Sequence, residues 1–206
     1  MARLFSIRPV LALKGRRFKG LRGWAGKPLH PPLTDVPVAA YVLVAILDLV
    51  SYIAGSQDSP GVARDTFVAG TWVIIAGVIV SFGAIITGIW DWWKGIERDR
   101  STGLIGRAKH TQVWRTINWH ATVMLVMTGV VIADIVVRLA QYEEAHTELP
   151  ALIFSVVAAV LVSFGAMYGG SLVYDYQFNV EDLEGSTAWD ESEIDQMPAD
   201  KPQAGW

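Results

Sequence analysis

The sequence predicts an all-α integral membrane protein, in which four transmembrane helices form a bundle and both chain ends are cytoplasmic. Of its 206 residues, 52% are hydrophobic and 18% are charged, whereas soluble domains average about 25% charged residues. About 20 helical residues cross a hydrocarbon layer of roughly 30 Å. Four apolar runs are long enough to do so, at 36–54, 67–90, 116–137 and 151–173.

The distribution of lysine and arginine predicts the orientation. Residues 1–34 contain eight basic residues and no acidic one, and the segment 91–115 contains six basic residues. The loops 55–66 and 138–150 contain one each, Arg64 and Arg138. Because short cytoplasmic segments are enriched in basic residues, we predict a multi-pass membrane protein with both termini inside. Its parts are a basic cytoplasmic leader (1–34), a four-helix transmembrane domain (35–175) and an acidic cytoplasmic tail (176–206).

The first span is preceded by a proline-rich stretch, Lys27-Pro28-Leu29-His30-Pro31-Pro32-Leu33-Thr34-Asp35-Val36-Pro37. Proline fixes φ and lacks a backbone donor, so we expect a rigid entry segment here and not helix interior. Further along, Asp48 lies inside the span, where an ionisable group is costly without a partner. Ser51 and Tyr52 lie within one turn of it, and Asp134 of the third span lies at similar depth. We therefore expect Asp48 to make a structural bond between helices.

The later spans show signs of interface anchoring and close helix packing. Five tryptophans fall at the predicted inner interface, where amphipathic rings are favoured: Trp90, Trp92, Trp93, Trp114 and Trp119. Pairs of small residues four apart allow helices to approach closely. They are Ala84-x-x-x-Gly88, Gly129-x-x-x-Ala133 and Gly165-x-x-x-Gly169. The short outer loops predict two antiparallel hairpins, one from spans one and two and one from spans three and four.

The two chain ends differ in composition. The leader is interpreted either as a helix lying on anionic lipid or as a disordered topology signal. Residues 175–206 contain nine acidic residues, with Lys201 as their only basic residue, so we expect no separate core in the tail. We expect no nucleic-acid partner, because the basic residues of the leader are explained by topology.

Several classes of chemistry are absent from the sequence. With no cysteine in the chain, disulfides, thiolate metal sites and cysteine nucleophiles are excluded. There is no G-x-S-x-G, phosphate-loop or H-E-x-x-H motif. Whether the chain is an enzyme stays open, and a non-enzymatic membrane component is favoured.

Polar residues gather at the predicted inner boundary and carry the cofactor hypotheses. These residues are His30, Asp35, Asp91, His110, Asn118, His120 and Tyr174. Two histidines at matching depth suit axial ligation of haem b, and His30 with His120 is the best pair, with His110 as the alternative. Histidine with carboxylates suits a divalent metal, which predicts a site of His30, Asp35 and Asp91. A third interpretation is that the histidines only bond the backbone at helix ends.

The motifs of the chain resemble those of a widespread bacterial family of four-helix membrane proteins of unknown function. The opening Leu29-His30-Pro31-Pro32-Leu33-Thr34-Asp35-Val36-Pro37 with Leu47-Asp48-Leu49 is the most specific part. Supporting parts are Gly88-Ile89-Trp90-Asp91-Trp92, His110, Asn118 and Gly169-Gly170-Ser171-Leu172-Val173-Tyr174. The resemblance covers about residues 26–180, and it implies a location in the bacterial inner membrane. The usual opening has a further histidine at the position of Lys27, which this chain lacks.

The resemblance also implies a redox setting. Some members of the family are fused to a Rieske-type iron–sulfur domain, and the segment from Trp189 to Pro202 is similar to the start of such domains. A Rieske cluster needs two cysteines and two histidines, and the chain has neither there. We therefore expect, besides the lipid bilayer, a separate Rieske, ferredoxin-type or respiratory protein partner. The function predicted is a redox-associated or accessory subunit acting at the cytoplasmic face. The alternative is a cofactor-free structural subunit of a respiratory-type membrane complex.

Overall fold

The computed structural model describes residues 20–21, 28–57, 59–95 and 112–178. Four helices account for most of these residues: α1 (His30–Ser56), α2 (Pro60–Gly95), α3 (Gln112–Ala140) and α4 (Leu149–Tyr174). All four are long and apolar enough to cross a membrane, which confirms the predicted all-α fold class. The predictions for His110, for most of the leader and for the tail beyond residue 178 lie outside the described residues.

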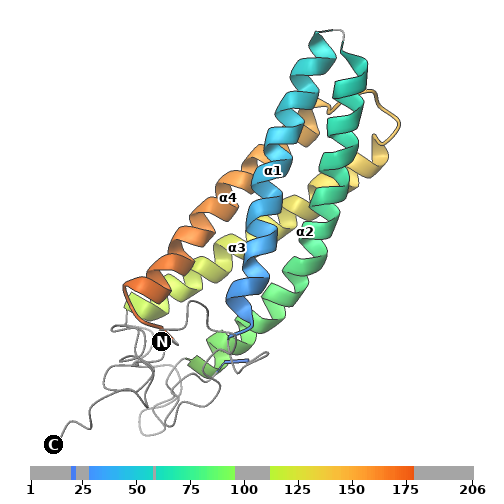
Figure 1. The fold of residues 1–206 in the computed structure, drawn as a ribbon. Helices are drawn as coiled ribbons and strands as arrows, with labels where there is room; N and C mark the ends of the chain where they lie inside the picture. Colours follow the sequence, from blue (N-terminus) through green and yellow to red (C-terminus); the bar gives the residue numbers. More distant parts are fainter. Residues whose placement is uncertain (1–19, 22–27, 58, 96–111, 179–206) are drawn as a thin grey trace, which may run out of the picture.

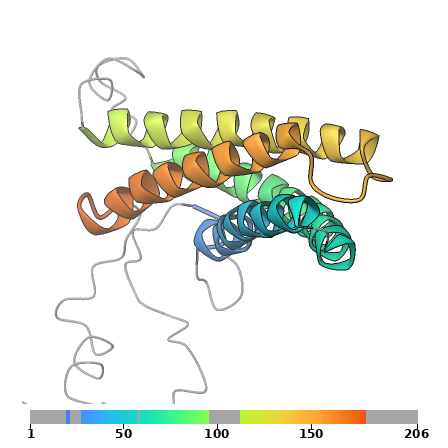
Figure 2. The same ribbon diagram turned by 90° about the horizontal axis from the view of Figure 1, so that it is seen from above.

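The helices form two antiparallel hairpins, as the loop lengths predict. α1 packs along α2, α3 packs along α4, and the hairpins meet through α1 with α4 and through α2 with α3. Figures 1 and 2 show the two hairpins as layers that cross at an angle. The start of α1 and the end of α4 lie at the same end of the bundle (Figure 1). We call this the histidine end, after His30, and the opposite end the hairpin-loop end.

Three of the four prolines of the entry stretch, Pro31, Pro32 and Pro37, lie inside α1, so the prediction that this stretch stays outside the helix is wrong for most of its length. α1 begins at His30, with proline in its first turn, and it also contains Pro37. Proline is compatible with the first turn because the N–H groups there have no helical acceptor. Pro37, in contrast, removes the N–H that would bond the carbonyl of Leu33. The rigid φ angles of the prolines therefore shape the start of the helix and do not delay it.

The middle of the bundle is an apolar core. Its buried members come from all four helices: Ala40, Tyr41, Val44, Ile74, Val78, Met127, Val131, Ala158 and Val162. The hydroxyl of Tyr41 is the polar group in this set, and it is bonded to Ser81 Oγ on α2 at 2.7 Å. This apolar layer separates the polar groups of the histidine end from those of the hairpin-loop end.

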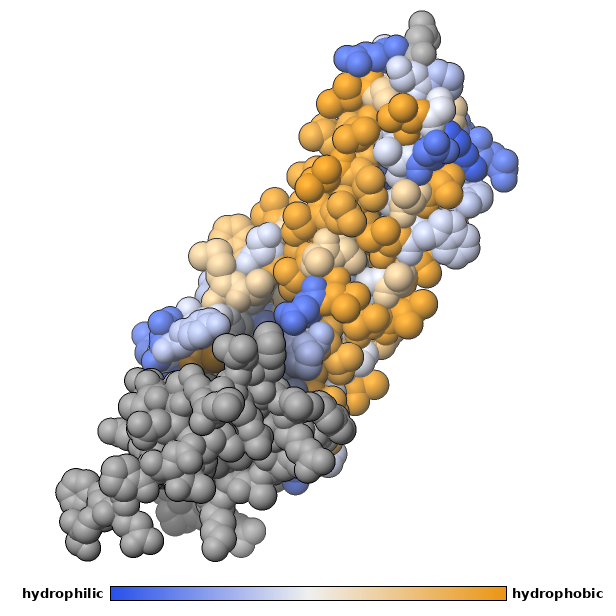
Figure 3. Space-filling view, viewed as in Figure 1, coloured by the Kyte–Doolittle hydropathy of each residue, from blue (hydrophilic) through white to orange (hydrophobic). Residues whose placement is uncertain are grey.

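The outer surface of the bundle is also apolar. Large side chains such as Ile79 (65% exposed), Ile86 (65%) and Met167 (68%) point outward. In Figure 3 the visible face is mostly hydrophobic along the bundle, and hydrophilic residues gather toward its ends. An apolar surface this continuous is expected for helices surrounded by lipid.

Candidate functional site

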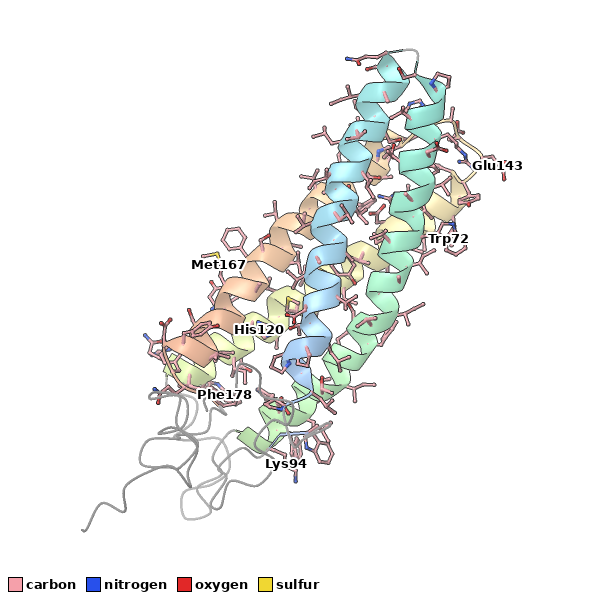
Figure 4. All side chains as sticks on the ribbon, in the orientation of Figure 1. Trp72, Lys94, His120, Glu143, Met167 and Phe178 are labelled. Carbon is pink, nitrogen blue, oxygen red and sulfur yellow. The ribbon has the colours of Figure 1, made fainter. Side chains whose placement is uncertain are left out.

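Two histidines from different hairpins meet near the histidine end. His30 is the first residue of α1, and His120 lies on α3 about two turns after its start. Figure 4 shows His120 in the half of the bundle that contains the start of α1. The ring centroids of His30 and His120 are 6.3 Å apart, and the ring planes are nearly perpendicular, at 88°. The structure therefore brings together the two histidines that the sequence favours as a pair.

Each imidazole is held by a main-chain carbonyl of the neighbouring helix. His30 Nδ1 lies 2.9 Å from the oxygen of Ala84 on α2, and His120 Nδ1 lies 2.8 Å from the oxygen of Gly165 on α4. A carbonyl oxygen can only accept, so we assign the ring hydrogen to Nδ1 in both residues. The lone pair of each neutral imidazole is then on Nε2, the atom available to ligate a metal.

Glycines permit this close approach of the rings to the helices. A Cβ atom added at Gly88 would lie 2.7 Å from Cε1 of His30, and one added at Gly169 would lie 3.2 Å from Cε1 of His120. These glycines belong to two of the small-residue pairs found in the sequence, Ala84-x-x-x-Gly88 and Gly165-x-x-x-Gly169. Gly88 and Gly169 therefore leave room for an imidazole ring between adjacent helices. Gly129 of the third pair has no atom within 4 Å of an added Cβ.

The other residues proposed for the inner boundary do not join the histidines. Asp35 is exposed, and the Tyr174 side chain is 85% exposed. Asn118 Nδ2 donates to the oxygen of Trp114 in its own helix, at 2.8 Å. Asp91 is buried and accepts a hydrogen bond of 3.0 Å from the backbone N–H of Leu21, which fastens part of the leader to the end of α2.

The two histidines are too few to bind a bare metal ion, and they suit a metal that is already held by a cofactor. Among the described residues, no group of three or more His, Cys, Asp or Glu could hold a metal ion, and the set His30, Asp35 and Asp91 is no exception. Metal ions bound by side chains alone need about four protein ligands, as zinc does. Two imidazoles are sufficient for the iron of a haem, whose macrocycle supplies the other ligands.

A second polar cluster lies at the hairpin-loop end. Arg138 Nε donates to Asp134 Oδ1 at 2.9 Å on the same helix, and Arg138 Nη2 contacts Asp48 Oδ2 on α1. Thr147 Oγ1, in the loop before α4, donates to Asp48 Oδ1 at 3.1 Å. All these side chains have no exposed surface. The expected bond between helices at Asp48 is therefore present, and it links α1 to α3 and to the loop before α4.

Asp134 joins Asp48 through Arg138, in line with the depth predicted for it, but the other partners of Asp48 differ from those that the sequence predicts. Arg138 was expected in the outer loop, but α3 continues to Ala140, so Arg138 is a buried residue of this helix. Ser51 donates instead to the oxygen of Ala63 at 2.6 Å and accepts from Thr147 N at 2.9 Å, and the Tyr52 side chain is exposed. The spacing of Asp134 and Arg138, four residues apart on one helix face, was the signal that could have identified the pair.

Replacing Gly88 with valine should displace His30. We expect Gly88→Val to lower the free energy of unfolding in detergent micelles by about 1–3 kcal/mol more than Gly129→Val, because overpacked sites must shift their neighbours. The two variants share the same change in helix propensity, so their difference isolates the contact with His30. Equal losses in the two variants would contradict the close packing described for Gly88.

Removing the Arg138 guanidinium should destabilise the bundle strongly. Arg138→Gln leaves two buried carboxyl groups without their cation, which costs about 3–5 kcal/mol. Arg64→Gln is the matched control, since Arg64 donates to the main-chain oxygens of Tyr142 and Glu144. Adding Asp48→Asn to Arg138→Gln should restore part of the loss in unfolding measurements. A double variant less stable than Arg138→Gln would count against the charge pairing.

Comparison with known proteins identifies a family. The model of a family described as "Predicted membrane protein (DUF2231)" matches residues 26–182. No curated protein matches the chain, and no solved structure matches it either.

Proposed function

We propose that this chain, which belongs to the DUF2231 family of predicted membrane proteins, is a redox-associated membrane subunit that holds one haem b between His30 and His120. The pairing of two imidazoles from different hairpins carries this proposal, since their ring centroids lie 6.3 Å apart. His30 and His120 would hold the iron of the haem, and the haem would supply one-electron chemistry.

The surroundings of the histidines also suit axial ligands. A ligating histidine generally donates its second ring hydrogen to a carbonyl or carboxylate, which fixes the tautomer and the ring orientation. Ala84 and Gly165 offer their carbonyl oxygens for this purpose. Haem bound there would supply one-electron chemistry, through the change between ferric and ferrous iron. The protein's own contribution is to orient two neutral imidazoles and to exclude water with apolar helices.

The proposed partner is an electron-transfer protein at the cytoplasmic face. The counts of lysine and arginine favour the histidine end as the cytoplasmic end. The apolar core, with Val44, Val131 and Val162 fully buried, lies between the histidines and the hairpin-loop end. Electron exchange is therefore expected at the histidine end, with a partner of the Rieske, ferredoxin-type or respiratory class. The Trp92 and Trp114 rings, with centroids 5.9 Å apart, connect α2 and α3 on this side.

Absorption spectra of the purified protein test the proposal. From cells supplied with a haem precursor, the wild type should carry low-spin haem b that responds to dithionite. His30→Ala and His120→Ala should each lower the haem content at least tenfold, because each removes one axial ligand. His146→Ala is the matched control. This histidine lies at the hairpin-loop end, where its Nε2 is 3.6 Å from Glu148, and its removal should leave the spectrum unchanged.

The outcomes separate the two functions predicted from the sequence. A wild-type protein that folds, stays monodisperse and carries no haem would overturn the redox proposal. Copurification of that colourless protein with respiratory subunits would then favour the cofactor-free structural subunit. Variants that lose haem but keep the elution volume of the wild type show that ligation, and not folding, has been lost.

A further inference from the structure

The hairpin-loop end contains an unequal number of buried charges. Asp48, Asp134 and Arg138 have no exposed surface, and they are the only ionisable members of the cluster among the described residues. Two carboxylates and one guanidinium leave one negative charge without a counter-charge. A net charge inside a lipid-surrounded bundle is strongly unfavourable, so the cluster needs one additional positive charge.

The charged groups that face the cluster from neighbouring elements do not supply it. Arg64 on α2 lies 5.7 Å from the centroid of the Phe67 ring, and Arg138 lies 6.0 Å from the same centroid. The Phe67 ring is thus a shared neighbour of the two guanidinium groups, and Arg64 donates to main-chain oxygens. His146 packs on Gly55 and faces Glu148. Asp65 is exposed to the surroundings.

A metal ion does not fit the cluster. No metal-binding group of His, Cys, Asp and Glu exists among the residues that the structure describes. The carboxylate oxygens already accept from Arg138 and Thr147. Arg138 Nη1, in addition, is a buried donor with no hydrogen-bond partner among the described residues. A Cβ atom added at Gly70 would lie 3.5 Å from Arg138 Nη1 and 3.3 Å from Asp48 Oδ1. A metal cation placed there would be repelled by the positive charge of this guanidinium.

We infer that the Asp48–Arg138–Asp134 cluster is a proton-binding site, which holds one proton on the carboxyl of Asp134. We place the negative charge on Asp48, because Arg138 Nη2 contacts one of its carboxylate oxygens and Thr147 Oγ1 donates to the other. Asp134 Oδ2 is farther from Arg138 Nη2, at 3.3 Å, and can carry the hydrogen while Oδ1 still accepts from Nε. The step is a simple binding: one proton from water converts one carboxylate to a carboxylic acid.

The position of the site determines where its proton is exchanged. The apolar core lies between the cluster and the histidines, so the proton exchanges with water at the hairpin-loop end, the side that the basic-residue counts predict to be external. This inference does not depend on haem, so a negative result for the proposed function would leave it unchanged.

Infrared spectroscopy of the purified protein in micelles at neutral pH tests the inference. A protonated carboxyl absorbs above the carboxylate bands, and the difference between wild type and Asp134→Asn should show the loss of one such group. Asparagine has the shape of the protonated acid, so this variant should be as stable as the wild type. Asp65→Asn, an exposed aspartate on α2, is the control and should leave the band unchanged.

A second variant keeps the inference testable if Asp134→Asn does not fold. Asp48→Asn leaves one carboxylate for one guanidinium, so Asp134 should release its proton and the band should again disappear. No band in the wild type would overturn the inference, because the cluster would then be fully ionised. A band that persists in either Asp134→Asn or Asp48→Asn would overturn it as well.

Discussion

The arrangement of the four helices depends on buried polar groups that find their partners on another helix. The outer surface is apolar, and lipid offers no hydrogen-bond partner to a side chain. His30 therefore reaches the main chain of α2, and His120 reaches the main chain of α4. Tyr41 joins α1 to α2 in the middle of the bundle, and Arg138 joins α3 to α1. Each bond fixes the register of two helices where apolar contacts alone would permit sliding.

The two ends of the bundle have different chemistry. The histidine end offers two neutral imidazoles, while the hairpin-loop end contains a fully buried cluster of three ionisable side chains, Asp48, Asp134 and Arg138. From His30 to Asp48 along α1 the distance is roughly 27 Å, at 1.5 Å per residue, and the side chains buried between them are mostly apolar. A ligand of the imidazoles and a proton on Asp134 are thus expected to act independently. The two proposed sites are therefore separated by an apolar layer.

The sequence predicts the helices and the histidine pair, because apolar length and matching depth are local properties of the chain. The hydrogen-bond partner of each polar side chain is harder to predict, since it depends on which face each helix turns inward and on where the helix ends. Arg138 is placed in a loop when the span is ended at the last apolar position, but α3 continues to Ala140 and Arg138 is buried against Asp48. The start of α1 is likewise misplaced from the sequence. Proline is unfavourable in the interior of a helix, but the first turn tolerates it. Asp35 and Tyr174 share a depth with the histidines but face away, which depth alone does not reveal.

Electron paramagnetic resonance of the oxidised protein tests the central claim, axial ligation by His30 and His120, most directly. If His30 and His120 hold a haem, their two imidazoles would make its ferric iron low-spin, and the oxidised protein should show a low-spin ferric signal. The nearly perpendicular ring planes, at 88°, should make that signal highly anisotropic. A high-spin ferric signal, or well-folded protein with no haem signal at all, would contradict the claim.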